Sequence, residues 1–192
     1  MKHIISLFFF LVLTINLTAQ ENRMYRQGFF SDVSITGGYS LGVMQTGEID
    51  VKHGTVKATQ RSDLFPFSLL VNGGWCFGNG FYAGLGTGYV FAMDFDFKLA
   101  DGLWPIYADF RYMFSDKKVS PFLGVSAGCA WMGGINLQRH PGPYCAASAG
   151  VTLSQHWSLL GRVAYSRGYY VPPATFERVD RTYLSIGASY AF

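Results

Sequence analysis

The chain has 192 residues, of which 14% are charged and 17% are aromatic, and it carries 23 glycines and a formal net charge of +3. This charge is too small for a nucleic-acid-binding protein, and the charged fraction lies well below the roughly 25% that is usual in a soluble domain. The composition therefore argues against nucleic acid as a partner and against an ordinary water-soluble globule.

The first 20 residues read MKHIISLFFFLVLTINLTAQ. Lys2 gives a basic start, an apolar core runs from Ile4 to Leu17, and Ala19 and Gln20 follow it. These features are typical of a secretory signal peptide, so we predict a leader over the first 19 residues, cleaved between Ala19 and Gln20. A retained membrane anchor is the alternative, but the core is shorter than the roughly 20 apolar residues of a spanning helix.

Turn-forming residues divide the rest of the chain into eight segments with the period-two alternation of β-strands. The predicted strands cover 29–43, 63–77, 81–97, 103–114, 119–133, 142–153, 157–171 and 181–192. Three tight turns, at 78–80, 115–118 and 154–156, alternate with four connections at 44–62, 98–102, 134–141 and 172–180 that are mostly longer and more polar. Alternating short turns and long loops are typical of an outer-membrane barrel.

The sequence therefore predicts an all-β fold, an eight-stranded antiparallel transmembrane β-barrel of meander topology over 29–192. Residues 20–28 are expected to form a short periplasmic segment, because an even number of strands places both termini on the periplasmic side. The longest connection, 44–62, alternates around His53 and Gly54, so we expect it to extend the first hairpin above the membrane. Two extra membrane-crossing strands are the alternative here, but 48–53 is too short to cross.

The predicted strands have one bulky apolar face and one face of glycine, small polar residues and a few charges. In 103–114, for example, Trp104, Ile106 and Phe110 alternate with Tyr107, Asp109 and Arg111. A soluble lipocalin-like barrel also alternates, but a soluble exterior carries about 25–35% charged residues. The small polar face instead suits the narrow interior of eight strands. We therefore predict a lipid-facing apolar wall and a lumen filled by side chains.

All four tryptophans fall on the bulky face near strand ends. Trp75 and Trp157 lie beside tight turns, and Trp104 and Trp131 lie near the longer connections. Outer-membrane barrels carry aromatic belts at both membrane interfaces. We predict that these tryptophans form such belts; the alternative is that they belong to an ordinary core.

Seven charged residues take the lumen parity: Asp32, Asp94, Asp96, Asp109, Arg111, Arg162 and Arg181. Buried charges must pair, so we expect Asp109, Arg111 and Arg162 to form a charge network. A network that plugs the barrel is favoured because eight strands leave little space. A polar track or gate for small anions is the alternative.

Two charged residues, Asp63 and Arg167, take the lipid parity toward the loop ends of their strands. Arg167 is a candidate contact for the phosphate of a sugar-lipid, since arginine binds phosphate strongly and often in a bidentate manner. The alternative is an arginine that reaches out to water at the rim.

The chain contains three cysteines, Cys76, Cys129 and Cys145, without the spacing of a metal site. Cys129 and Cys145 lie at equal distances from residue 137, so a simple hairpin would place them opposite each other. A cross-strand disulfide between them is therefore a hypothesis.

His156 and Ser158 offer a pair that could activate a hydroxyl in a lipid-modifying enzyme. They lie at a tight turn on the periplasmic side, with lumen parity and without a nearby acid, so we interpret His156 as a polar turn residue. His53 and His140 stand alone in loops, which does not favour a metal site. No catalytic residue, metal or cofactor is expected.

In the last strand, the apolar parity continues to the final residue, Phe192, with Tyr190 before it. This ending resembles the signal that barrel-assembly machinery reads. The segment PIYADFRYMFSDKKVSPFLGVSAG (105–128) resembles the central hairpin of small outer-membrane β-barrel proteins. The resemblance implies the fold and a place in the outer membrane of a Gram-negative bacterium, with membrane lipid as a partner, and it implies no reaction.

We therefore expect a non-enzymatic surface or envelope protein that acts through the loops 44–62, 134–141 and 172–180. A narrow channel or carrier for small or apolar solutes is the alternative, and a lipid-modifying enzyme is a distant third. The sequence does not indicate an extracellular ligand.

Overall fold

The computed structural model describes residues 26–51, 54–62, 64–93, 99–133, 139–170 and 177–192. Its ten strands are β1 (Gly28–Val51), β2 (Gly54–Ser62), β3 (Phe65–Cys76), β4 (Phe81–Met93), β5 (Leu99–Met113), β6 (Ser120–Gly133), β7 (Arg139–His140), β8 (Gly142–Thr152), β9 (Trp157–Tyr170) and β10 (Glu177–Ala191). Within these residues no helix is long and apolar enough to cross a membrane.

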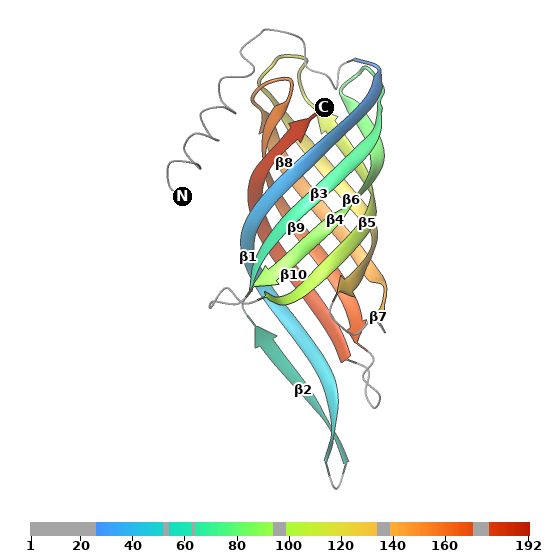
Figure 1. The fold of residues 1–192 in the computed structure, drawn as a ribbon, viewed down its shortest axis with the longest axis vertical. Coiled ribbons are helices and arrows are strands. Elements are labelled where there is room, and N and C mark those ends of the chain that lie inside the picture. Colours follow the sequence, from blue (N-terminus) through green and yellow to red (C-terminus); the bar gives the residue numbers. More distant parts are fainter. Residues whose placement is uncertain (1–25, 52–53, 63, 94–98, 134–138, 171–176) are drawn as a thin grey trace.

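Eight strands close into an antiparallel barrel in the order β1-β3-β4-β5-β6-β8-β9-β10 (Figure 1). Closure is achieved by β10, which pairs with β9 along one edge and with β1 along the other. Each barrel strand thus pairs with the barrel strands before and after it in the chain. The predicted eight-stranded antiparallel meander is confirmed.

The two ends of the barrel differ. The start of β1, the tight turns and the C-terminus lie at one end, since Gly28 is the register partner of Cys76 and Asp32 that of Ala191. We call this the turn end and the opposite one the loop end (Figure 1).

All four predicted connections at the loop end contain strand residues. β2 and the end of β1 lie in 44–62, and β7 lies in 134–141. β5 begins at Leu99, inside the predicted connection 98–102, and β10 begins at Glu177, inside 172–180. Pairing continues past the apolar part of each strand, so polar residues there do not mark a strand end.

The connection 44–62 extends the first hairpin, as predicted (Figure 1). β1 pairs with β3 only as far as Gly37, and β2 then becomes its partner from Val43 to Val51. The alternative of two further barrel strands is wrong, because β2 pairs with β1 and lies off the closed path of the sheet.

Burial alternates along the barrel strands as the parity predicted. On β3, for example, Ser68, Leu70 and Asn72 are buried and Leu69 and Val71 are exposed. Some lumen positions must be glycine to admit large neighbours. A Cβ atom at Gly86 would collide with the Tyr107 ring and the Asn72 amide, so this glycine makes room for both side chains.

Several predictions fall outside the described residues. These are the leader and its cleavage site at Ala19 and Gln20, His53, Asp63, Asp94, Asp96 and the side chain of His140.

Candidate functional site

A buried ion-pair network lies in the lumen toward the turn end, where Arg111 is the register partner of Tyr82 and Asp32 that of Ala191. Arg111 on β5 donates through Nε to Oδ2 of Asp109 at 2.7 Å, and its Nη2 lies 3.1 Å from Oδ1 of Asp32 on β1. All three side chains are buried. Because β3 and β4 separate β1 from β5 in the sheet, the contact between Arg111 and Asp32 crosses the lumen and links two walls of the barrel.

Hydrogen bonds extend this network. Ser126 donates its hydroxyl to Asp109 Oδ1 at 2.8 Å, and Asn72 donates through Nδ2 to Asp32 Oδ2 at 3.4 Å. The Tyr107 hydroxyl donates to Oδ1 of Asn72 at 2.8 Å. Carboxylates that are removed from water are tolerated when ion pairs and hydrogen bonds compensate them, so this arrangement is what a plug requires.

Arg162 lies in the same lumen but among aromatic side chains. Its guanidinium stands over the Tyr107 ring, 5.6 Å from the centroid, and Tyr144 and Tyr183 lie near it. Among the described residues, its Nε and Nη1 have no hydrogen-bond partner. The structure thus brings Asp109 and Arg111 together, adds Asp32 to them, and places Arg162 against tyrosines.

Apolar clusters close the lumen at both ends. The turn-end seal is the cluster Phe30, Cys76, Tyr82, Met113, Phe122 and Ala191, all of them buried. The second cluster of buried side chains reaches the loop end and includes Leu64, Val90, Ala92, Leu103, Met132 and Val179, which we call the loop-end seal. The ion-pair network therefore lies between two apolar seals.

The space left in the lumen is small. One cavity of about 20 Å³ lies at the turn end, one of about 20 Å³ lies toward the loop end beside Arg181, and one of about 10 Å³ lies between Arg111 and Arg162. A single water needs about 10–15 Å³. Each of these three cavities has room for about one water.

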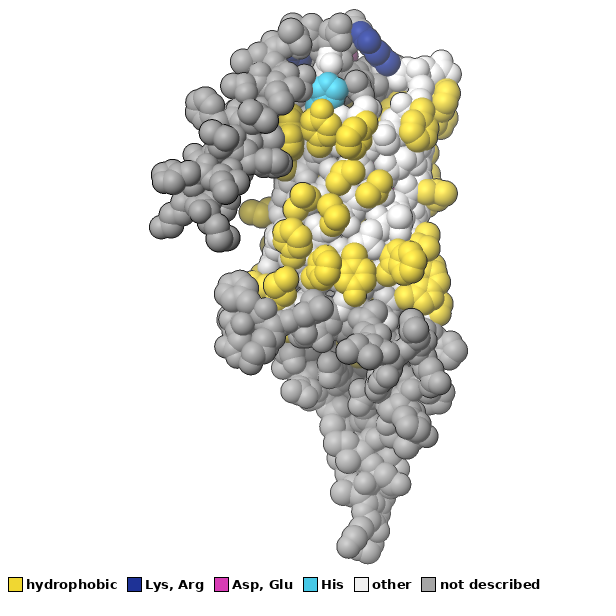
Figure 2. All heavy atoms as spheres, viewed as in Figure 1, with side chains coloured by type: hydrophobic (Ala, Val, Ile, Leu, Met, Phe, Trp, Pro, Cys, Tyr) yellow, Lys and Arg dark blue, Asp and Glu magenta, His cyan; other side chains and the backbone are white. Residues whose placement is uncertain are grey.

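The outer wall is apolar. Phe29, Leu85 and Ile186 are 73%, 68% and 72% exposed, and Figure 2 shows apolar side chains over the height of the wall on the face in view. The barrel therefore buries its ion pairs in the lumen and exposes large apolar residues on its outer wall.

The four tryptophans all take the outward face. Trp75 and Trp104 are about half exposed, and Trp131 and Trp157 are partly exposed. Near the loop end Trp104 is the register partner of Trp131, and its indole donates to the Thr87 hydroxyl at 2.9 Å. The structure therefore places one pair toward each end of the wall, as aromatic belts require.

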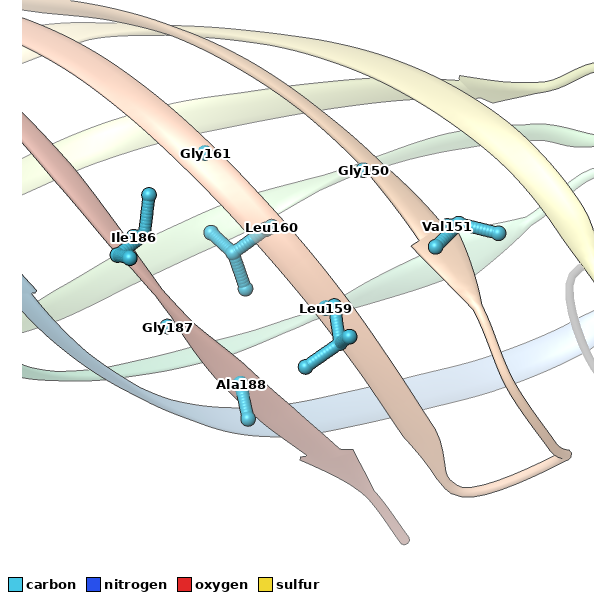
Figure 3. Close-up of a pocket in the computed structure, with 8 residues that line it drawn as sticks. All are labelled: Gly150, Val151, Leu159, Leu160, Gly161, Ile186, Gly187 and Ala188. Atoms are coloured by element: carbon cyan, nitrogen blue, oxygen red, sulfur yellow. The ribbon is translucent and has the colours of Figure 1, made fainter.

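An open, apolar hollow of about 590 Å³ interrupts this wall over β8, β9 and β10 (Figure 3). It lies where Gly161 takes an outward position, between Leu159 and Ile186. A Cβ atom at Gly161 would meet nothing closer than two backbone oxygens at 3.9 Å. The hollow therefore results from a missing side chain on the lipid-facing side, and packing does not require the glycine.

Arg167 lies on the outer face near the loop end and is partly exposed. Its Nε donates to Asp180 Oδ1 at 2.7 Å, and the Tyr165 hydroxyl donates to the same oxygen at 2.6 Å. Asp180 lies in a segment expected to be loop, so this partner could not be found from the sequence. A contact of Arg167 with lipid phosphate stays a prediction. In such a contact, Asp180 would orient the guanidinium.

The cysteine pair does not have the predicted register. Cys145 is the register partner of Ala127, and Cys129 that of Pro143, so the two cysteines stand diagonally. Both are free, as is the buried Cys76. The structure therefore does not show the hypothesised disulfide, because the pairing of β6 with β8 is centred on residue 136 and not on residue 137.

His156 and Ser158 do not form a pair. The His156 ring stacks on Tyr190, and its Nδ1 lies 2.8 Å from the carbonyl oxygen of Ala191. Ser158 instead lines the cavity at the turn end of the lumen. The lumen parity predicted for His156 is wrong, because the residue lies in the turn, where strand alternation does not hold.

No group of three or more metal-binding side chains is present in the part of the chain that the structure describes. Sequence reasoning overlooked Asn72 and Ser126, and it did not assign Asp32 to the network. All three residues have the lumen parity in the sequence, and this is the signal that could have identified them as members of the network.

The C-terminal residues are tied to both neighbouring strands. Phe192 donates its backbone N–H to the carbonyl of Ser31 at 3.0 Å, and Ala191 donates to the carbonyl of His156 at 2.7 Å. The rings of Tyr190 and Phe192 are in contact, with centroids 5.2 Å apart. The terminal aromatic is thus fixed at the turn end while its side chain remains 62% exposed.

No family model and no curated sequence matches this chain. Solved structures that resemble it include the outer membrane protein OprG from Pseudomonas aeruginosa, with 13% identity, 84% of this chain and 96% of that chain covered, and a TM-score of 0.49. Outer membrane protein AlkL in lipid bilayers shows 15% identity, 92% and 94% coverage, and a TM-score of 0.48. The outer membrane protease OmpT from Escherichia coli shows 9% identity, 92% and 99% coverage, and a TM-score of 0.47.

Proposed function

We propose that this protein is an integral outer-membrane barrel with a closed lumen, and that it acts at the cell surface through the segments at its loop end. In this proposal the leader directs export, both termini lie in the periplasm, and the tight turns face the periplasm. The role is structural or adhesive and does not involve catalysis.

The distribution of polarity supports a place in the membrane. The charged side chains of the ion-pair network pair inside the barrel, Arg162 stands over an aromatic ring there, and the wall exposes large apolar side chains that would be unfavourable in water. A period-two wall that is apolar outside and polar inside is typical of transmembrane barrels.

The observation that carries the functional proposal is the double closure of the lumen. An ion-pair network that links β1 and β5 lies between the turn-end seal and the loop-end seal. The cavities that remain hold about one water each. A solute path would require both seals and the network to rearrange, so function is expected at the ends of the barrel.

Biogenesis is a further element of the proposal. The exposed terminal side chain of Phe192, next to Tyr190, suits recognition by the barrel-assembly machinery before the last strand closes the barrel. In the closed barrel the backbone of Phe192 is bound to Ser31, so the signal would be read before β10 pairs with β1.

Reconstitution tests the closed lumen. The mature protein in liposomes, with folding verified by a gel-mobility shift on boiling, is expected to pass neither small ions nor sugars. A variant that opens both seals, Phe122→Ala with Met132→Ala, serves as a comparison for leakage through the lumen. Flux through the unaltered protein that disappears on changing Arg111 or Arg162 would overturn the proposal and make the protein a channel.

A further inference from the structure

We propose that the free edge of β2 is a docking site for an extended, acidic segment of another protein, which adds to the sheet as a further strand. The inference rests on the proposed function, because the loop end must face the outside for a partner to reach it.

The backbone of β2 offers an unused edge. All nine of its residues pair with β1, from Val43 with Ser62 to Val51 with Gly54, without a register shift. Among the described residues β2 pairs with no other strand. An edge of this kind presents a row of N–H and C=O groups that can pair with another chain.

The edge also lacks the features that usually prevent strand addition. Sheet edges are commonly protected by very short strands, proline or bulges. β2 has nine residues, no proline and a regular register. Lysine on an edge strand also discourages pairing with other chains. β2 contains one lysine, Lys57, and its charge limits which partners can pair with this edge.

Charge decides which partner fits. Lys57 and Arg61 are the only charged residues of β2. In the register Glu48 stands opposite Lys57, whereas Met44 stands opposite Arg61. Positions four apart belong to one face of a strand, and like charges on paired strands are unfavourable. A second copy of β2 would therefore be disfavoured in the register that sets Lys57 opposite Arg61 and would offer no opposite charge in any other, whereas a strand with acidic residues four apart would match both.

A third strand would also stabilise the hairpin of β1 and β2. β10 supports β1 as far as the pair of Thr46 with Arg178. Among the described residues, only β1 and β2 continue beyond Thr46 in this part of the sheet, and Figure 1 shows this section projecting past the loop end of the barrel. A two-stranded hairpin is marginal in water, so an added strand would stabilise the projecting section.

A designed peptide tests the proposal. The probe is a fluorescent nine-residue peptide of threonine and valine with two glutamates four residues apart, titrated against the full mature barrel in lipid nanodiscs. Saturable binding is expected, with affinity lower by about tenfold or more when lysine replaces both glutamates. The variant Lys57→Glu with Arg61→Glu is expected to reverse this preference.

N-methylation identifies the binding mode. Methylation of alternate peptide nitrogens removes the donors on one edge only, so one of the two alternate sets should abolish binding and the other should preserve it. A shortened hairpin, with residues 48–57 replaced by Asn-Gly, should lose binding while the barrel keeps its gel-mobility shift. Equal binding by both methylated sets, or undiminished binding by the shortened hairpin, would overturn the proposal.

Two other outcomes are separable. Hairpin-dependent dimers that exclude the peptide would identify a second copy as the occupant and refute an acidic partner. Flux measured on the same preparation tests the closed lumen independently. A conducting barrel that binds the peptide would refute the closed lumen and keep the docking site. A closed barrel that does not bind the peptide would refute the docking site and keep the closed lumen.

Discussion

Arg111 is the residue on which the interior depends most. It binds Asp109 on its own strand and Asp32 on a distant one, so one guanidinium both neutralises two carboxylates and links two walls. Removal of one member of a buried charge network leaves the others without compensation. Such a residue is expected to matter more than any single apolar contact of the lumen.

We therefore predict that Asp109→Asn lowers the free energy of unfolding by about 3 kcal/mol, because Arg111 loses a charged partner that is fully buried. The measurement is urea unfolding in lipid vesicles, followed by tryptophan fluorescence. The matched control is Ser126→Ala, which removes one hydrogen bond to the same carboxylate and should cost about 1 kcal/mol. Equal losses for the two variants would contradict a dominant ion pair.

At the scale of single residues, the sequence correctly predicted which face of the barrel the charged strand residues of the network take, but it misplaced the turn residue His156 and predicted only some of the contacts. The parity of Asp109, Arg111 and Arg162 placed all three in the lumen, where they are buried. Contact across a lumen depends on how the strands are staggered around the barrel, which no single strand encodes. For that reason the partner Asp32 and the tyrosines around Arg162 became apparent only in the structure.

Among the elements, β4 offers the clearest test of the membrane-facing wall. Phe81 and Leu85 lie four residues apart on its outward face, the first beside a tight turn and the second further into the wall. In a strand that crosses a bilayer, an outward charge is costly near the middle of the membrane and costs little near the interface.

We predict that Leu85→Arg makes folding into lipid vesicles less favourable by about 2–4 kcal/mol, and Phe81→Arg by about 0–1 kcal/mol. The cost arises from placing a cation in hydrocarbon and falls toward the interface. The measurement is the equilibrium between unfolded protein in urea and folded protein in the bilayer. Equal, small effects at both positions would mean that the wall faces water.

Strand ends are harder to predict than strand interiors. The loop-end starts of β5 and β10 fall in segments that the sequence predicts as connections, and Asp180, the partner of Arg167, lies in one of them. Outside hydrocarbon, polar residues occur in strands and loops alike, so composition carries no boundary signal there. The expected register of Cys129 with Cys145 was wrong for a related reason, since it assumed a hairpin centred on residue 137 and the pairing is centred on residue 136.

The whole molecule is asymmetric along its axis. Tight turns and the C-terminus occupy one end, and the projecting hairpin of β1 and β2 occupies the other (Figure 1). The fold class, the strand order and the two faces followed from the period-two pattern, since each is a local property repeated eight times. The two seals are a collective property of side chains from many strands and did not follow from it.

We predict that an epitope inserted between Val51 and Gly54 is bound by antibody on intact cells, whereas one inserted in the tight turn 115–118 is bound only after the outer membrane is opened. The reason is that the two sites lie at opposite ends of a barrel whose termini are expected in the periplasm. The check is whole-cell immunofluorescence, with gel mobility confirming that both insertions fold. The reverse pattern would invert the orientation.

The length of β1 has a mechanical consequence. This single strand of 24 residues belongs to the hairpin at one end and to the closed wall at the other. Tension applied at the hairpin tip along β1 would load its pairings with β3 and β10 in shear, so that many hydrogen bonds share the force and do not break in succession. A cell held through this hairpin would be tethered by the barrel wall itself, without an intervening flexible linker.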